Sequence, residues 1–225
     1  MQPLTAVVLG SSGLIGSHVV QQLLADAAFS KVRILVRRKA EWTHPKLEVA
    51  VADFNNVSDF KKKLGSGDCI FSCIGTTQKQ VKGDQAMYRS VDFDIPVNAA
   101  RWGKEAGFTK FLLISSVGAN STSSNFYLRL KGEVEKEISS LNYTSFQVFR
   151  PGILFGKRAE FRPGEIIGKI VMQIISPLLV AGLSKYKGIR ASDVAKAMVA
   201  AAKANKGGTE ILHYSDIIHL AANAN

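Results

Sequence analysis

The sequence predicts an α/β domain built on a doubly wound parallel sheet, with a short C-terminal lobe beside it. Apolar runs of strand length alternate along the chain with segments patterned as helices, the order that gives a parallel sheet. Most of these runs are continuously apolar, which is typical of strands buried on both faces. Connections between such strands are right-handed, so helices are expected on both faces of the sheet.

The first strand and helix are separated by spaced glycines. A β-branched apolar run at residues 4–9 ends at Gly10, and an amphipathic helical pattern follows. Gly10 permits a tight turn, Gly13 lets the backbone approach a pyrophosphate, and Gly16 lets the helix pack closely on the strand. A glycine triplet alone is often only a turn, but between a strand and a helix it predicts a dinucleotide site at the positive end of the helix.

The second apolar run, residues 32–39, ends with two arginines and a lysine. In this kind of fold, an acidic residue at that place binds the ribose hydroxyls of the adenosine. Arg37 and Arg38 stand there instead, and a guanidinium group matches a phosphate in fork geometry. This favours a cofactor with a 2′-phosphate, so NADP(H) is preferred over NAD(H). The alternative is a pair of solvated cations at a strand end.

Three further apolar runs continue the alternation, at residues 47–51, 69–74 and 111–114. Helix-patterned stretches at 56–64 and 84–105 lie between them. Ligands of a doubly wound sheet lie at the carboxyl ends of its strands. The residues that follow these runs are therefore expected to converge on one site: Asp53, Phe54, Gly75, Ser115 and Ser116.

A second motif lies on a helix predicted to begin near Asn125. Tyr127 and Lys131 are four residues apart and share one face of that helix. The charge of the lysine would stabilise a phenolate and lower a tyrosine pKa that is otherwise about 10, which suits proton transfer to or from a substrate oxygen. The lysine can also hydrogen-bond a ribose, and the hydroxyl of Ser115 or Ser116 can hold the substrate oxygen. The alternative, an amphipathic helix with a buried ring, is weakened by the serine pair and the glycine motif.

Several stretches together resemble the short-chain dehydrogenase/reductase superfamily, in its atypical or extended branch, whose members have a Rossmann fold. The general motifs are Gly10-x-x-Gly13-x-x-Gly16, Ser115-Ser116, Tyr127-x-x-x-Lys131 and Arg150-Pro151-Gly152. Stretches at 73–77, 123–127, 131–135 and 149–154 are most similar to the Tat-interacting-protein-type oxidoreductases of that branch. The resemblance spans nearly the whole chain and implies a single NAD(P)-binding domain over residues 1–225.

The resemblance implies a role for each matching position. Tyr127 would be the catalytic acid/base and Lys131 its partner, with Ser116 as the serine usually employed and Ser115 the alternative if the strand ends one residue earlier. Many relatives have the asparagine of a catalytic tetrad near the place of Asp92, which puts a proton relay there in doubt. The implied cofactor contacts are Ser11, Ser12, Gly13, Leu14 and Ile15 on the pyrophosphate, Arg37 and Arg38 on the adenosine phosphate, Asp53 and Phe54 at the adenine, Cys73, Ile74 and Gly75 after the fourth strand, and Lys131, Pro151, Gly152 and Ile153 near the nicotinamide.

Composition agrees with one globular domain. The chain has 225 residues, 46% of them hydrophobic, with no internal repeat or low-complexity tract. It enters the first strand almost at once, without a targeting pattern, so the cytoplasm is the expected compartment. The net charge of +11 raises nucleic acid as a partner, but the basic residues are dispersed and the one dense cluster, Lys61 to Lys63, ends a predicted helix where cations suit the dipole. Nucleic-acid binding is therefore not expected.

Cysteine and histidine patterns predict neither a disulfide nor a metal site. Cys69 and Cys73 lie on one predicted strand about 13 Å apart, too far to bridge, and are expected to pack in the core with Cys73 near the cofactor. The four histidines are scattered without metal-ligand spacing.

The chain after Pro151 is expected to form a small substrate lobe, mainly residues 152–190. A mostly apolar helix is predicted at 166–175, packed over the cofactor cleft; Lys169, Gln173 and Pro177 argue against a membrane span there. A dimer face, a lipid-like substrate site and a membrane-surface contact are the alternatives for this helix. Beyond the lobe, the sequence predicts a helix capped by Ser192, a last strand at 210–214 and a helix from residue 215.

The leading functional hypothesis is an NADP(H)-dependent oxidoreductase that acts on a small-molecule carbonyl or alcohol, as a monomer or homodimer. The resemblance also raises a regulatory protein whose cofactor state governs a protein partner. A nucleotide-sugar epimerase or dehydratase comes third, because those enzymes generally need a larger C-terminal lobe. The sequence does not identify the substrate.

Overall fold

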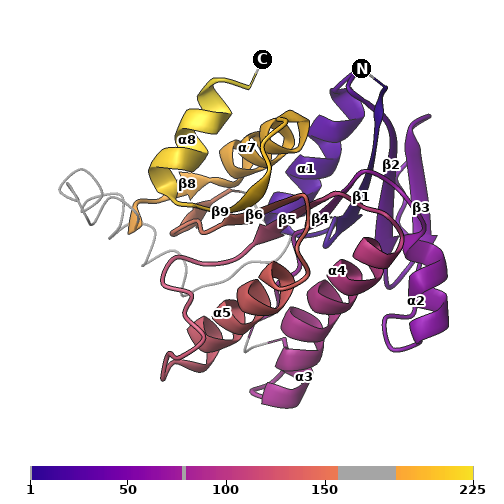
Figure 1. Cartoon of the computed structure of the whole chain (residues 1–225). Coiled ribbons are helices and arrows are strands. Elements are labelled where there is room, and N and C mark those ends of the chain that lie inside the picture. The colour runs from indigo at the N-terminus through magenta and orange to yellow at the C-terminus, as the bar shows by residue number, and fades with distance from the viewer. Residues whose placement is uncertain (1, 78–79, 157–185, 225) are drawn as a thin grey trace.

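The computed structural model describes residues 2–77, 80–156 and 186–224. Within them, seven parallel strands form one sheet in the order β3-β2-β1-β4-β5-β6-β9, with helices on both faces (Figure 1). The predicted doubly wound parallel sheet is thus confirmed. Most of the predicted substrate lobe, including the apolar helix at 166–175, lies outside the described residues.

The elements alternate in the order that the sequence predicted. The strands of the sheet are β1 (Leu4–Leu9), β2 (Phe29–Val36), β3 (Leu47–Val51), β4 (Cys69–Ser72), β5 (Lys110–Ile114), β6 (Ser145–Phe149) and β9 (Gly208–Leu212). The helices are α1 (Leu14–Ala25), α2 (Val57–Leu64), α3 (Gln85–Arg89), the π-helix η1 (Ser90–Asp94), α4 (Ile95–Glu105), α5 (Phe126–Ser139), α7 (Ala191–Lys203) and α8 (Tyr214–Ala222). Two short strands, β7 (Leu154–Phe155) and β8 (Ile189–Arg190), pair in a second sheet.

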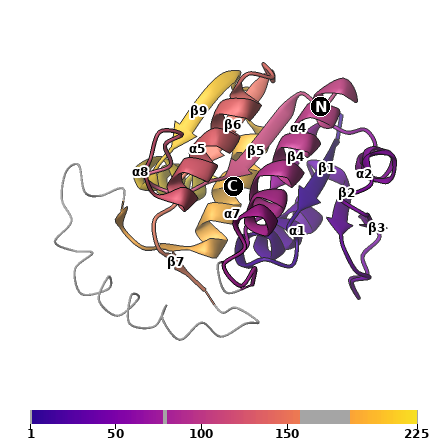
Figure 2. The ribbon, with the colours of Figure 1, turned by 90° about the horizontal axis from the view of Figure 1, so that it is seen from below.

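The sheet separates two hydrophobic cores. Helices α1, α7 and α8 cover one face, and α2, α4 and α5 cover the other (Figures 1 and 2). Strand β1 shows why the central strands are continuously apolar: Ala6 and Val8 lie in the first core, whereas Val7 and Leu9 lie in the second. Successive side chains of a strand point to opposite faces of the sheet. Because helices cover both faces, all four side chains are fully buried.

Three details differ from the sequence prediction. Strand β6 was not predicted, because Ser145 and Gln147 interrupt its apolar pattern, although both are buried. The helix predicted at 84–105 is divided into α3, η1 and α4 by the π-helical turn. The predicted N-cap at Ser192 is wrong: the N-cap of α7 lies two residues earlier, at Arg190, and the helix begins at the buried Ala191. Ala191 belongs to the helix because its burial in the core outweighs the cap preference of the serine.

The C-terminal elements follow the prediction with small shifts. Strand β9 begins and ends two residues before the predicted range and pairs in parallel with β6. Helix α8 begins at Tyr214, after a capping box between His213 and Asp216. No helix in the described part of the chain combines the length and apolar character that crossing a membrane requires.

Candidate active site

The junction between β1 and α1 requires glycine at two positions, Gly10 in the turn and Gly16 in the first turn of the helix. Gly10 has φ +78°, and a Cβ there would lie 2.6 Å from the carbonyl oxygen of Cys73. A Cβ on Gly16 would lie 2.1 Å from the carbonyl oxygen of Gly10. Helix α1 therefore begins in direct contact with the end of β1, and its first N–H groups face the carboxyl edge of the sheet.

Gly13 is the N-cap of α1 and is packed less tightly. Its N–H donates to the Gly10 carbonyl at 3.0 Å, and the nearest atom to a Cβ placed on it is that same oxygen, at 3.2 Å. Ser11 beside it is buried and Ser12 is exposed. The unpaired N–H groups of this helix end and the absent side chain at Gly13 form a cradle that fits an anionic pyrophosphate.

The two arginines predicted to bind a phosphate lie directly after β2 and are exposed. Within the part of the chain that the structure describes, neither Arg37 nor Arg38 is held by a hydrogen bond or an ion pair. Arg33, on the same strand, is instead tied to Glu48 at 3.0 Å and to the Leu64 carbonyl at 2.7 Å. The guanidinium groups of Arg37 and Arg38 are thus available to an external anion, whereas that of Arg33 is structural.

The residues after β3 and β4 border the same edge. Asp53 is exposed, and its N–H donates to the Asp59 carboxylate at 2.9 Å. The Phe54 ring packs edge-on against Phe60, with centroids 4.8 Å apart. Cys73 donates its N–H to the Leu9 carbonyl at 2.9 Å, which places the segment from Cys73 to Gly75 against the glycine turn.

Neither cysteine is an activated nucleophile. Both are free thiols. Burial raises the pKa of Cys73 to about 12 and raises the pKa of Cys69 further, so both remain protonated at neutral pH. Among the described residues, no group of three or more histidine, cysteine or acidic side chains has the arrangement of a metal site.

Helix α5 carries the tyrosine and lysine of the second motif. It begins after Asn125, whose side chain accepts the N–H of Leu128 as an N-cap. The Nζ of Lys131 lies 5.9 Å from the centroid of the Tyr127 ring. The Lys131 side chain is 7% exposed, so its ammonium lies in a nearly dry environment beside the half-buried phenol.

Asp92, on η1, is the ion-pair partner of this lysine. Its Oδ1 lies 3.0 Å from Lys131 Nζ, and its Oδ2 accepts the backbone N–H of Thr76 at 2.7 Å. Burial would lower the pKa of Lys131, but the charges of Asp92, Tyr127 and Glu135 together outweigh it and raise that pKa. Lys131 is therefore protonated at neutral pH. The sequence placed Asp92 near this site but did not predict the ion pair.

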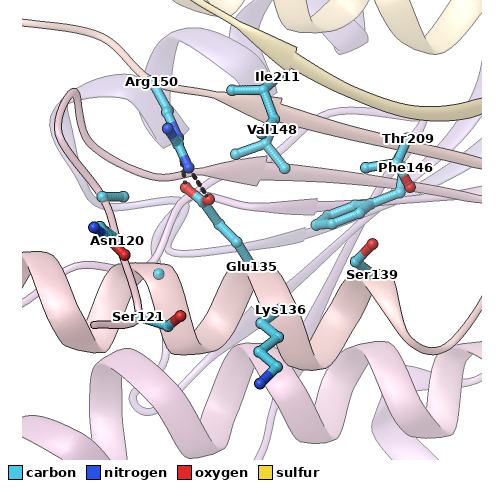
Figure 3. A pocket seen from close by; sticks show the side chains of 12 residues that line it. Asn120, Ser121, Glu135, Lys136, Ser139, Phe146, Val148, Arg150, Thr209 and Ile211 are labelled. Atoms are coloured by element: carbon cyan, nitrogen blue, oxygen red, sulfur yellow. Dashed lines mark hydrogen bonds and ion pairs between the residues drawn. The ribbon is translucent and has the colours of Figure 1, made fainter. Parts of the chain in front are cut away.

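The two strand-terminal serines have different partners. The Ser115 hydroxyl donates to Glu135. The Glu135 carboxylate also accepts two bonds from Arg150, one of them 3.0 Å long from Nε (Figure 3). Ser115 is buried. Ser116 is half-buried, and its hydroxyl donates to the Val117 carbonyl at 3.2 Å. The hydroxyl of Ser115 is thus committed to a buried charged cluster, whereas that of Ser116 is weakly held.

The sequence did not predict the contact between Glu135 and Arg150, and Arg150 stood there only as part of a motif. Glu135 stands one helical turn after Lys131, and Arg150 follows β6 directly. The helix spacing was a usable signal for Glu135, since residues four apart share a face. The partner of Glu135 could not be read from the sequence, because Arg150 is brought to it by strand pairing.

The segment predicted to lie near the nicotinamide also reaches this edge. The Val117 N–H donates to the Pro151 carbonyl at 3.1 Å, which places residues 151–153 beside the serine pair. The Ile153 carbonyl accepts the N–H of Ile189 at 2.8 Å. The structure therefore brings together the glycine turn, the segment after β4, the serine pair, the Tyr127 helix and this segment at the carboxyl ends of the strands.

A cavity of about 300 Å³ lies elsewhere, between α5 and the strands β6 and β9 (Figure 3). Glu135 and Arg150 form part of its wall, and polar side chains such as Lys136 and Thr209 line it together with the exposed Ile211. None of the residues predicted to bind cofactor or to perform chemistry lines this cavity. It is distinct from the candidate active site.

Comparisons with known proteins show the family of the chain. A model of the NAD(P)H-binding family matches residues 10–160. Protein HTATIP2 of Rattus norvegicus is 35% identical, over 75% of this chain and 70% of its own length. Protein FMP52, mitochondrial, of Coccidioides immitis (strain RS) is 31% identical, over 96% of both chains.

Solved structures with much lower identity share the fold. The enzyme WbmH of Bordetella bronchiseptica, in complex with NAD⁺, superposes with a TM-score of 0.72 at 16% identity, over 98% of this chain and 80% of its own. A UDP-N-acetylglucosamine 4-epimerase from Methanobrevibacter ruminantium gives 0.70 at 20% identity, over 95% and 77%. At such identities the likeness concerns the fold alone.

Proposed function

This chain belongs to the NAD(P)H-binding family, in the atypical branch of the short-chain dehydrogenases/reductases, and we propose that it is an NADP(H)-dependent oxidoreductase acting on a carbonyl or alcohol. The observation that carries the proposal is the buried, protonated Lys131 beside Tyr127. Such a pair serves proton transfer at a substrate oxygen, and it lies at the strand edge where this fold binds dinucleotides.

The proposed cofactor contacts follow from the geometry of the edge. The backbone from Ser11 to Ile15, which spans the turn and the first two residues of α1, would hold the pyrophosphate, and Arg37 and Arg38 would hold the 2′-phosphate. Asp53 and Phe54 would border the adenine. The nicotinamide end would lie against two segments, Cys73 to Gly75 and Pro151 to Ile153, with Lys131 in reach of the ribose.

The proposed chemistry is a reversible hydride and proton transfer, for which the bound cofactor supplies or accepts the hydride. In the direction of reduction, the substrate carbonyl carbon receives the hydride and Tyr127 gives its phenol proton to the oxygen. The Lys131 ammonium stabilises the phenolate that remains, and Ser116 donates a hydrogen bond to the substrate oxygen. In the reverse direction, the Tyr127 phenolate accepts the proton of the alcohol.

The cofactor preference is tested by titrating the purified protein with NADPH and with NADH. A charge-assisted hydrogen bond contributes about 1.5–3 kcal/mol, so even one such bond to the 2′-phosphate should make NADPH bind roughly 10- to 100-fold more tightly than NADH. Arg37→Ala/Arg38→Ala should bring the two dissociation constants together by weakening NADPH alone. Arg101→Ala removes an exposed arginine on α4 and serves as the control. Equal affinities in the unmodified protein would contradict the assignment of the arginines.

The serine assignment is tested with two matched variants. Ser116→Ala is expected to lower kcat by about 10²-fold or more, because it removes a donor to the reacting oxygen, and to leave stability nearly unchanged. Ser115→Ala should instead lower the free energy of unfolding by about 1–3 kcal/mol, because it leaves a buried charged cluster with one donor fewer. Steady-state kinetics and urea denaturation measure the two effects. The reverse pattern would exchange the roles of the serines.

Two finer points stay predictions. The cytoplasm was expected from the sequence, yet FMP52 relatives carry the word mitochondrial in their names, so fractionation of cells that express the protein is the direct test. If the protein has a partner that responds to its cofactor state, its affinity for that partner should change when NADPH is added.

A further inference from the structure

We propose that Asp92 is a positioning residue of the candidate active site, which keeps Lys131 charged and fixed beside Tyr127 and links it to the segment after β4. The proposal deepens the proposed function and rests on it. Many relatives have the asparagine of a catalytic tetrad near this position, but neither the family match nor the fold assigns a role to an aspartate there.

Burial is the first argument. Asp92 is 1% exposed and Lys131 is 6% exposed, so both charges lie out of water. An isolated charge in such a place is costly, and a buried lysine without a partner loses its proton readily. Because the two groups are 3.0 Å apart, each compensates the charge of the other. Removal of the carboxylate would leave Lys131 with burial acting against its charged form.

The second argument is that both oxygens of the carboxylate are used. Oδ1 faces the ammonium of Lys131, and Oδ2 accepts the Thr76 N–H at 2.7 Å. Thr76 follows Gly75, the end of the segment that lies against the glycine turn. A single side chain thus connects the lysine of α5 to the backbone proposed to line the cofactor.

The third argument is local structure. Asp92 lies within η1, a π-helical turn between α3 and α4. Such turns are rare in proteins as a whole, but those that occur are often found at functional sites. The extra residue in the turn changes the direction of the side chains that follow. In this chain, the π turn contains a fully buried carboxylate that is directed at α5.

Among the described residues, Asp92 is the acidic side chain that forms an ion pair with Lys131. From α5 itself, Tyr127 and Glu135 face it, but Glu135 is engaged by Arg150, which follows β6, and by Ser115, which follows β5. From α3, the Tyr88 ring faces Tyr127, with centroids 6.5 Å apart. Asp92, from η1, supplies the carboxylate in ion-pair contact.

The test measures the protonation of Lys131 directly, in the protein without cofactor. Lysine side chains are labelled with ¹³C at Cε, the Lys131 signal is assigned by its loss in Lys131→Met, and its chemical shift is followed against pH. In Asp92→Asn, the Lys131 midpoint is expected to fall by about one pH unit or more, because burial then acts without the opposing charge. Asp92→Ala should give the same fall, although asparagine retains an acceptor for the Thr76 N–H and alanine does not.

Glu133→Gln provides the matched control. Glu133 lies on α5, as Lys131 does, and pairs with Arg89 at 2.6 Å on the surface. Its replacement should therefore leave the titration midpoint of Lys131 unchanged. An unchanged midpoint in Asp92→Asn would overturn the proposal. A fall in Asp92→Ala but not in Asp92→Asn would also overturn it, because the hydrogen bond to Thr76 and not the charge would then be responsible.

A stability cycle covers the case in which Asp92→Asn does not fold. If Asp92 acts through Lys131, its replacement should cost little stability, or add some, in the Lys131→Met background. Lys131→Met leaves the buried Asp92 carboxylate without its partner, and Asp92→Asn removes that lone charge. An Asp92→Asn/Lys131→Met protein much less stable than Lys131→Met would overturn the proposal. None of these measurements requires NADPH, so a failure of the proposed function, seen as absent cofactor binding, remains distinguishable from a failure of the role of Asp92.

Discussion

Tyr127→Phe is expected to lower turnover by about 10²- to 10⁴-fold, the usual contribution of a positioned acid or base, while the dissociation constant of NADPH changes by less than about twofold. The substitution removes only the phenol oxygen. The ring remains, and with it the edge contact to Tyr88 and the position of Lys131. Oxidation of NADPH in the presence of a panel of carbonyl compounds measures turnover, and a fluorescence titration measures cofactor affinity.

The control for this variant is the same chemical change at another tyrosine. Tyr143 is buried, and its hydroxyl donates to the Ala100 carbonyl at 2.5 Å, on the face of the sheet covered by α4. Tyr143→Phe should cost about 1 kcal/mol of stability through the lost hydrogen bond and leave turnover intact. Full activity in Tyr127→Phe would rule out the proposed mechanism, and a cofactor-sensing role with little chemistry would then become the leading interpretation.

Gly16→Ala is expected to have the largest effect on the fold. The new Cβ would lie 2.1 Å from the carbonyl oxygen of Gly10. That oxygen belongs to the backbone, and the position of the Cβ is fixed by the helix, so neither atom can rotate away. Overpacking of a well-packed core usually costs about 1–3 kcal/mol, and a contact this short against backbone places the loss at about 3 kcal/mol or more. To relieve it, α1 must move away from β1, which would also open the proposed pyrophosphate cradle.

Urea denaturation and NADPH titration measure the two consequences together. Gly207→Ala is the control: a Cβ there meets only the Thr144 carbonyl, at 3.3 Å, at a loop position remote from the site. It should change the free energy of unfolding by much less than Gly16→Ala. Wild-type stability in Gly16→Ala would mean that the turn tolerates a side chain and that the glycine spacing is not a packing requirement.

Elements with an uninterrupted apolar run were predicted well. Strands β1 and β5 differ from prediction by one residue at most, because burial on both faces leaves a clear pattern in the sequence. The predicted range of the edge strand β3 is also the observed one, although Glu48 interrupts its apolar run and Val51 is exposed. Helix α5 begins where predicted, since Asn125 is a strong N-cap. Strand β6 escaped prediction because its buried Ser145 and Gln147 are polar, and only pairing with β5 and β9 makes the segment a strand.

The motif residues of the site were identified from the sequence, and their roles stay predictions. Glycine spacing, the arginines after β2 and the Tyr127–Lys131 pair are local patterns, each contained within a few residues. The sequence left open which serine is available. The structure shows the hydroxyl of Ser115 bound to Glu135, which leaves Ser116 as the less engaged hydroxyl of the pair.

By itself, the sequence determined the family, the parallel α/β fold and the positions of the motifs, because these depend on short-range periodicity and on residues close together in the chain. Only the tertiary structure decided which charged groups meet. Asp92 reaches Lys131 from a π-helical turn, and Arg150 reaches Glu135 across the end of β6. Such pairs are set by how elements far apart in sequence pack on the sheet, and hydrophobic patterning carries no information about the register that brings two buried charges within 3.0 Å.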